Sequence, residues 1–166
     1  MTNVPWVERP VEQARLLNPA FLGAILWCCA RAYASAGAVN QPFALSFLVA
    51  PIVLHRSTRE SLPGTTRTSL VAWLAANPKV LVGFPKRATS LVPFVKEALL
   101  FASGGGLIKV QDACIVAAGR PRTMAKFERD ATDEVRSCIK KSEFIGKWFA
   151  LSGDYATLMA LWGVAP

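Results

Sequence analysis

A long apolar stretch near the N-terminus constrains the fold more than any other feature of the sequence. Asn18 is typical of a helix N-cap and Pro19 of the first helical position, and the residues up to about Ser35 are apolar on nearly every side. Because a helix that is apolar all round offers no face to water, other elements must bury it. We therefore predict a central helix over residues 19–35 that is ended by Gly37.

Two uncharged apolar stretches could suggest a membrane protein, since the mean hydropathy is +0.33. They cover Pro19 to Ala30 and Phe43 to Leu54. Both are shorter than the ~20 residues that a spanning helix needs, so we expect buried core helices and no membrane segment. The N-terminus lacks the basic start and the apolar run of a signal peptide, which predicts a cytoplasmic location.

The composition favours one domain that offers apolar surface to a partner. A chain of 166 residues is near the usual size of one domain, so we predict a single domain over residues 1–166. Apolar residues make up 52% of the chain and charged residues 18%, against roughly 25% charged residues in an average soluble domain. Because so few charges cannot cover the surface, some apolar surface should meet a partner.

Helical segments separated by breaks fill the next part of the chain. The segment 43–54 is predicted to be a helix that its internal proline kinks or interrupts. The segment 55–66 is rich in Ser, Thr, Arg, Pro and Gly and is predicted to be a connection. A short helix through residues 70–74 follows, with Thr66 or Thr68 as its cap.

A long helix followed by a β-hairpin is the next predicted unit. The helix covers residues 85–103, and the glycines at 104–106 terminate it. The apolar period then becomes that of strands, which predicts a hairpin over residues 107–116. Helices, a glycine-rich break and a hairpin follow one another in a winged helix. The predicted fold class is therefore mainly α with a small β-hairpin (α+β), with a winged-helix-like core in residues 1–118. One face of the long helix is apolar and consists of Leu91, Val95, Ala98, Leu99 and Ala102.

Residues 119–166 are predicted to form a C-terminal helical extension. A helix of mixed charge is expected from Thr123 to about Lys141. Two short helices, one opened by Ser142 and one capped by Asp154, are expected to form a helical hairpin. The residues expected to pack it are Trp148, Phe149, Leu158 and Trp162.

Few residues could support catalysis or bind a metal or a cofactor. His55 is the only histidine, and nothing near it in the sequence suggests a catalytic triad or a metal site. The acidic residues at 128–134 alternate with basic ones, and pairing along one helix explains them. We therefore predict no catalytic residue, no metal, no cofactor and no enzyme activity. The cysteines lack the C-x-x-C spacing and are interpreted as small buried hydrophobic residues: Cys28, Cys29, Cys114 and Cys138.

A cluster of arginines predicts contact with an acidic partner. The net charge of +8 arises in residues 13–96, where nine basic residues accompany a single acid, Glu60. Arg56, Arg59 and Arg67 alternate there with serine and threonine hydroxyls, and phosphate oxygens accept hydrogen bonds from both kinds of group. A solvated loop with caps and turns would have the same composition, so the sequence leaves both interpretations open.

Two further basic residues begin the long helix predicted over residues 85–103. Lys86 and Arg87 lie in its first turn, where the helix N-terminus adds its own attraction for phosphate. Together with Arg56, Arg59 and Arg67, they are the residues that we predict to bind a partner or DNA.

Four stretches carry a resemblance to a known family. They are LLNPAFLGAIL, VLHRSTRESLPGTTRTSLVAWL, VGFPKRATSLVPFVKEALLFA and IGKWFALSGDYATLMALWGVAP. Over residues 16–110 and 142–166 the chain resembles the middle component of bacterial three-component ABC systems of the Lamassu type. The resemblance implies a non-catalytic subunit that bridges an SMC-like ABC ATPase and an effector, often a nuclease, in anti-phage or anti-plasmid defence. It also implies that Arg56, Arg59 and Arg67 are the best candidates for contact with the ATPase or with double-stranded DNA.

A second hypothesis from another class of protein is a stand-alone transcription regulator. A dimeric winged-helix protein would bind operator DNA by itself, and the basic residues of the first part of the chain would contact the phosphates. The salt dependence of DNA binding separates the two hypotheses.

Overall fold

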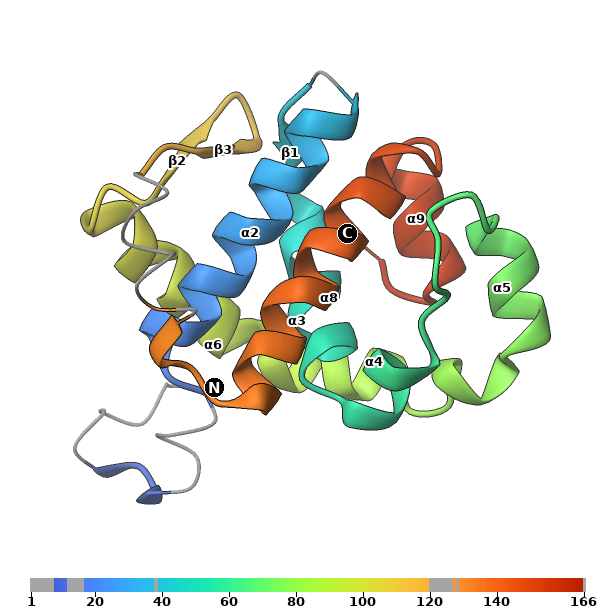
Figure 1. The fold of residues 1–166 in the computed structure, drawn as a ribbon, viewed down its shortest axis with the longest axis horizontal. Coiled ribbons are helices and arrows are strands. Elements are labelled where there is room, and N and C mark those ends of the chain that lie inside the picture. Colours follow the sequence, from blue (N-terminus) through green and yellow to red (C-terminus); the bar gives the residue numbers. More distant parts are fainter. Residues whose placement is uncertain (1–7, 12–16, 38, 120–126, 128, 166) are drawn as a thin grey trace.

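The computed structural model describes residues 8–11, 17–37, 39–119, 127 and 129–165. These residues are mainly helical and include one small antiparallel sheet, which confirms the predicted class of a mainly α protein with a small β part (Figure 1). Their buried apolar side chains, from the helices and from the sheet, form one contiguous core.

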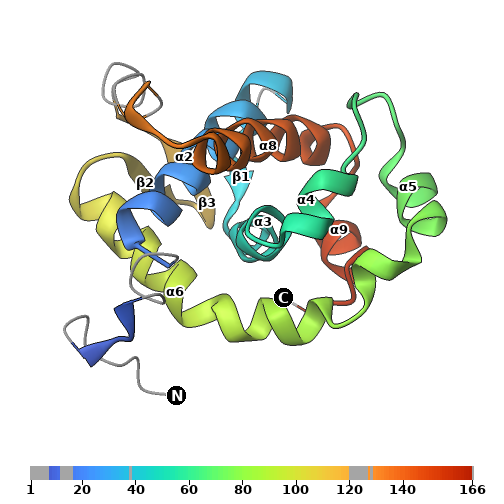
Figure 2. The ribbon, with the colours of Figure 1, turned by 60° about the horizontal axis from the view of Figure 1, so that its bottom comes forward.

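Two apolar helices lie at the centre of the fold. Helix α2 covers Pro19–Gly37, and helix α3 covers Ser46–Val53 after the short 3-10 helix η2 at Phe43–Leu45. Asn18 caps α2, because its Oδ1 accepts a 2.8 Å hydrogen bond from the backbone N–H of Ala20. Figure 2 shows α3 between α2 and α8 on one side and α6 on the other. The helices predicted over 19–35 and 43–54 are therefore confirmed.

Among the described residues, α2 alone is a helix long and apolar enough to cross a membrane by length and composition. Most of it is buried inside the protein, where it packs against α3, α6 and α8. Its apolar character is thus explained by its place in the core.

The long helix and the hairpin lie close to the predicted positions. Helix α6 covers Phe84–Gly104, and strands β2, Ile108–Gln111, and β3, Cys114–Ala117, form the antiparallel hairpin. The two turn residues, Asp112 and Ala113, have φ values of 50° and 55°, which is the geometry of a tight hairpin turn.

A third strand joins this hairpin. Strand β1, Gln41–Pro42, pairs antiparallel with β3, so the strand order is β1-β3-β2. The sheet therefore ties the segment between α2 and α3 to the segment that follows α6.

The segment predicted to be a connection over residues 55–66 is helical in its first half, over residues 56–61, so the prediction is wrong there, while residues 62–66 form no helix. Helix α4 covers Arg56–Ser61, and His55 caps it by accepting a hydrogen bond from the backbone N–H of Thr58 at 3.3 Å. Histidine is not among the usual capping residues, which explains why the sequence pattern did not reveal the helix start.

The next short helix, α5, covers Leu70–Ala76 and is followed by the 3-10 helix η3 at Pro78–Leu81. Its cap is Ser69, so the prediction that Thr66 or Thr68 caps it is wrong.

The predicted helix break at Ser142 does not occur. Helix α8 runs without interruption over Asp133–Ala150, and the start predicted at Thr123 lies outside the described residues. Ser142 does not cap a new helix, because its hydroxyl donates a 2.5 Å hydrogen bond to the carbonyl of Ile25 in α2. The serine thus joins two helices instead of beginning one.

The last helix, α9, covers Tyr155–Leu161 and is capped by Asp154 as predicted. Trp148, in the last turn of α8, and Trp162, directly after α9, are buried, which confirms the packing role predicted for them. Their rings lie 5.4 Å and 6.2 Å, respectively, from the ring of Trp73 in α5. The C-terminal helices therefore pack on the earlier part of the chain as well.

The contact between α2 and α8 depends on a glycine. A Cβ atom at Gly146 would lie 2.2 Å from the carbonyl oxygen of Cys29 and 3.0 Å from the backbone nitrogen of Tyr33. Because backbone atoms of a packed helix cannot move aside as a side chain tip can, any larger residue would push the two helices apart. Glycine at this position lets the helix backbones touch.

We expect Gly146→Ala to destabilise the protein by roughly 3 kcal/mol, because overpacking against a backbone forces helix displacement. Urea unfolding followed by circular dichroism measures the change. The matched control is Gly104→Ala at the end of α6, where a Cβ atom would meet nothing within 4 Å and stability should change by less than about 1 kcal/mol. Equal effects of the two substitutions would contradict the role of the close helix contact.

Candidate functional site

The five basic residues predicted to contact a partner lie in different surroundings. Arg56, Arg67 and Lys86 are exposed, Arg87 is half-buried, and Arg59 is buried with 1% of its surface exposed. The structure therefore does not present them as one continuous basic surface.

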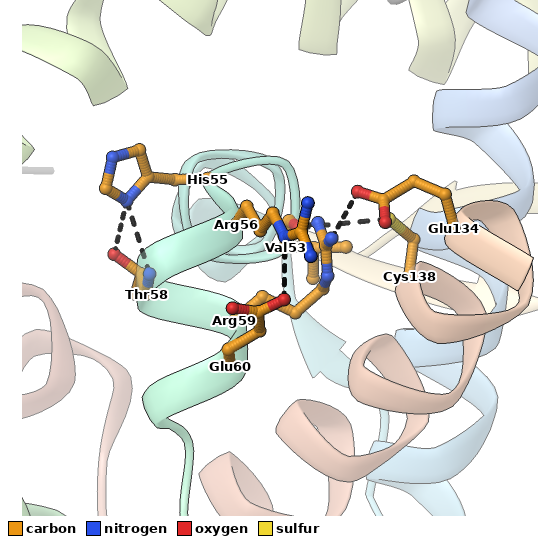
Figure 3. Close-up of polar contacts among 8 residues, drawn as sticks. All are labelled: Val53, His55, Arg56, Thr58, Arg59, Glu60, Glu134 and Cys138. Atoms are coloured by element: carbon orange, nitrogen blue, oxygen red, sulfur yellow. Dashed lines mark hydrogen bonds and ion pairs between the residues drawn. The ribbon is translucent and has the colours of Figure 1, made fainter.

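Arg59 reaches from α4 into the interior, which does not suit its predicted role as a surface contact. One terminal nitrogen donates a 2.6 Å hydrogen bond to the carbonyl of Val53 at the end of α3, and the other pairs with Glu134 of α8 (Figure 3). The side chain of Glu134 is 61% exposed, so the pair joins a buried cation to an anion near the surface. Arg59 thereby connects α3, α4 and α8.

This pair also corrects the interpretation of the acidic residues at 128–134. Asp133 pairs with Arg136 three residues later at 2.8 Å, as expected for neighbours on one helix. Glu134 instead pairs with Arg59, which is 75 positions away in the sequence. A pairing of that range cannot be inferred from helical spacing.

The exposed arginine of α4 makes a local contact only. Arg56 pairs with Glu60 one helical turn away at 2.7 Å, and both side chains are well exposed (Figure 3). Exposed pairs of this kind contribute little to stability, so Arg56 can change partners at low cost. Arg67 is exposed in the segment between α4 and α5.

Arg87 is held in place at the first turns of α6. Its Nε donates a 3.3 Å hydrogen bond to the carbonyl of Pro51, and its guanidinium lies 5.2 Å from the ring centre of Phe84. Burial lowers the pKa of this guanidinium from its ordinary value. Neighbouring Lys86 is exposed, so the two basic residues of this turn face different surroundings.

Arg59 and Arg87 both line a pocket of about 1190 Å³. The pocket lies where the start of α2, the junction of α3 and α4, the first half of α6 and the start of α8 meet. Most of the exposed area of its wall is apolar, although about half of the lining residues are polar or charged, and apolar walls with polar groups among them are typical of ligand sites. The structure thus brings two of the five predicted residues together at one cavity.

His55 also lines the pocket, although the sequence gave no reason to place it in a site. Its Nδ1 accepts the backbone N–H of Thr58 and lies 2.7 Å from the threonine hydroxyl. Burial, and then the positive charge of Arg87, lower the pKa of the imidazole below its ordinary value. The neutral ring is therefore the form that caps α4.

The cysteines are mostly in the interior, as predicted. Cys28, Cys29 and Cys138 are buried and Cys114 is half-buried, and all four are free thiols. Cys138 lines the pocket next to the Arg59 pair, and burial raises the pKa of its thiol. A protonated thiol is a poor nucleophile and a poor metal ligand. In the described part of the chain no group of three or more His, Cys, Asp and Glu side chains could hold a metal ion.

Sequence reasoning could not locate the pocket itself, because its wall comes from four separate parts of the chain. A partial signal existed for Arg59 alone, since it follows the apolar helix α3, whose last carbonyls need donors. Only the packed structure shows that both side chains turn toward the carbonyls at the end of α3.

Comparisons with known proteins give one result. The family model described as ABC-three component (ABC-3C) system Middle Component 3, abbreviated MC3, matches residues 6–166. No curated protein and no solved structure matches the chain.

The cap of α4 predicts a pH dependence of stability. Because the folded pKa of His55 lies below the unfolded value of about 6.5, the unfolded chain binds more protons around that value. The contribution of His55 to stability is therefore fully present above pH 6.5 and is lost as the pH falls below that value. We expect the thermal midpoint to decrease between pH 7.5 and pH 5.5, and to decrease less in His55→Asn, which retains a capping acceptor that does not titrate. The same decrease in both proteins would exclude His55 as the cause.

Proposed function

The chain belongs to the MC3 family of ABC-three component systems, and from this premise we propose that it is a non-catalytic subunit that bridges an SMC-like ABC ATPase and an effector such as a nuclease. Other components of such a system are its partners. The proposal places the assembly in the cytoplasm, in a Lamassu-type defence against phages or plasmids. ATP- or DNA-driven changes in the ATPase would alter the surfaces that the subunit bridges and so shift the effector between inactive and active arrangements.

The observation that carries this proposal is the extent of the family match. It covers residues 6–166, so the match extends over all the described helices and strands. We therefore assign the role of a middle component to the whole fold and not to one part of it.

The use of the reactive groups supports a non-catalytic role. The imidazole of His55 caps α4, and the guanidinium of Arg59 pairs with Glu134 and with the carbonyl of Val53. Each group is committed to a structural contact, and the thiol of Cys138 is kept protonated by burial.

Two exposed apolar positions at opposite ends of α6 support a bridging role. Val82, just before the helix, is 76% exposed, and Leu100, near its end, is 75% exposed. A helix rises about 1.5 Å per residue, so these positions are roughly 25 Å apart. Figure 2 shows α6 extending along one side of the molecule from the region of α5 to the hairpin. Two partners could therefore bind without competing for one surface.

We also propose that the subunit contacts DNA, and the winged-helix-like arrangement of α6 and the hairpin supports this. The hairpin β2–β3 follows α6 directly, and β1 completes the sheet from a position between α2 and α3. A helix flanked by such a hairpin is a common DNA-binding arrangement. Lys86 is exposed near the start of α6, where it could contact a phosphate. The same observations favour the alternative function, a stand-alone regulator.

The exposed arginines provide the test of the bridging role. We expect Arg56→Glu combined with Arg67→Glu to reduce recovery of the ATPase at least tenfold when the tagged subunit is purified from cells that express the whole operon, because the charge reversals repel an acidic partner. Quantitative mass spectrometry of the purified complex measures recovery.

The matched control is Lys140→Glu combined with Lys147→Glu, since both lysines are exposed on α8 and the change in net charge is the same. Normal recovery with the arginine variant would remove these residues from the interface. Recovery of the wild-type subunit without any ATPase would exclude the bridging function itself.

The salt dependence of DNA binding distinguishes the bridging function from that of a stand-alone regulator. A stand-alone regulator should bind double-stranded DNA by itself, with an affinity that falls at least a hundredfold between 50 and 200 mM salt if it contacts about five phosphates. We expect the isolated subunit to show no such steep binding in fluorescence anisotropy. Tight, salt-dependent binding that Lys86→Gln weakens would favour the regulator.

A further inference from the structure

The pocket between α2, α4, α6 and α8 has walls suited to an apolar body. Phe21, Leu54, Leu91 and Val135 line it, and each comes from a different part of the chain. All four are half-buried apolar side chains packed against the core. The volume of about 1190 Å³ is enough for a ligand with a long apolar chain or several rings. Binding such a ligand would remove these side chains from water.

One cation at this pocket lacks an anionic partner. The charge of Arg59 is balanced by Glu134. Arg87, by contrast, has no carboxylate within ion-pair distance among the described residues, and its Nη2 is shielded from solvent without an acceptor among them. A half-buried guanidinium without an anionic partner is unfavourable, so an anion in the pocket would stabilise it.

The guanidinium of Arg87 is also fixed before any ligand arrives. Its Nε is bound to the carbonyl of Pro51, and its plane is packed near the ring of Phe84. Because the side chain is already ordered, a ligand that binds the part of the guanidinium at the pocket wall does not have to immobilise it. The donor therefore resembles the few well-placed polar groups that orient ligands in apolar pockets.

We propose that this pocket binds a small molecule with an apolar body and a single carboxylate, and that Arg87 holds the carboxylate. The inference does not depend on the bridging function. A singly charged group fits better than a phosphate, because Arg87 is a single cation and phosphate oxygens need several donors. The carboxylates of Asp130 and Glu134, which also line the pocket, would repel a dianion more strongly than a monoanion.

The test uses the full chain and three probes with the same ten-carbon chain: decanoate, decanol and decylammonium. Isothermal titration calorimetry should show binding in the order decanoate, decanol, decylammonium, with decanoate at least tenfold tighter than decanol, because a charge-assisted hydrogen bond is added to the same apolar contact. Arg87→Gln should weaken decanoate at least tenfold and leave decanol within twofold.

Two further variants keep the test decisive if Arg87→Gln affects folding. Ser90→Glu places a negative charge on an exposed residue that lines the pocket, so it should weaken decanoate at least fivefold and spare decanol. Lys86→Gln removes an exposed cation one position from Arg87 that does not line the pocket, and it should change decanoate binding less than twofold.

Three outcomes would overturn the proposal. They are no binding of decanoate, equal binding of decanoate and decanol, and an equal loss of decanoate affinity in Arg87→Gln and Lys86→Gln, which would indicate attraction to the net positive charge. None of them bears on whether the subunit associates with an ATPase, so the failure of one proposal is distinguishable from the failure of the other.

Discussion

The direct backbone contact between α2 and α8 is the constraint on which the rest of the structure depends. At Gly146 the two helices approach so closely that no side chain fits between them, and the hydroxyl of Ser142 joins α8 to the carbonyl of Ile25 one turn earlier. Because α2 also packs against α3 and α6, its position fixes that of the other central helices. The apolar core is therefore organised around the closest approach of two helices that lie more than a hundred positions apart in the sequence.

The same arrangement determines what happens at the start of α8. Once α8 is held against α2, Glu134 lies where Arg59 can reach it, and Arg59 then satisfies the carbonyl of Val53 at the end of α3. The pocket is the space that remains around this junction, and Arg87 enters it from α6 because its Nε is bound to the carbonyl of Pro51. The two arginines that donate to carbonyls at the end of α3 thus also supply positive charge to the wall of a largely apolar cavity. This explains why Arg59 is buried, although arginines seldom are.

Much of the secondary structure could be predicted, and the failures have specific causes. The helix after Asn18, the glycine-terminated helix α6 and the hairpin follow from caps, apolar periodicity and strand alternation, which are local properties of the chain. Helix α4 was missed because a histidine caps it. The break predicted at Ser142 was wrong because that hydroxyl binds a carbonyl of another helix. The predicted contact role of the arginines stays a prediction, and the structure shows that they do not share one surface, since Arg59 is buried while Arg56 and Arg67 are exposed.

The sequence by itself determined the fold class, the central apolar helix and the resemblance to middle components of ABC systems, because apolar pattern, caps and distinctive stretches are properties of neighbouring residues. Only the tertiary structure decided which arginine is buried, which carboxylate pairs with it and where the pocket lies. Those facts depend on contacts between residues tens of positions apart, such as Arg59 with Glu134. Packing selects such contacts through shape and the need to satisfy buried polar groups, and no local pattern records that choice.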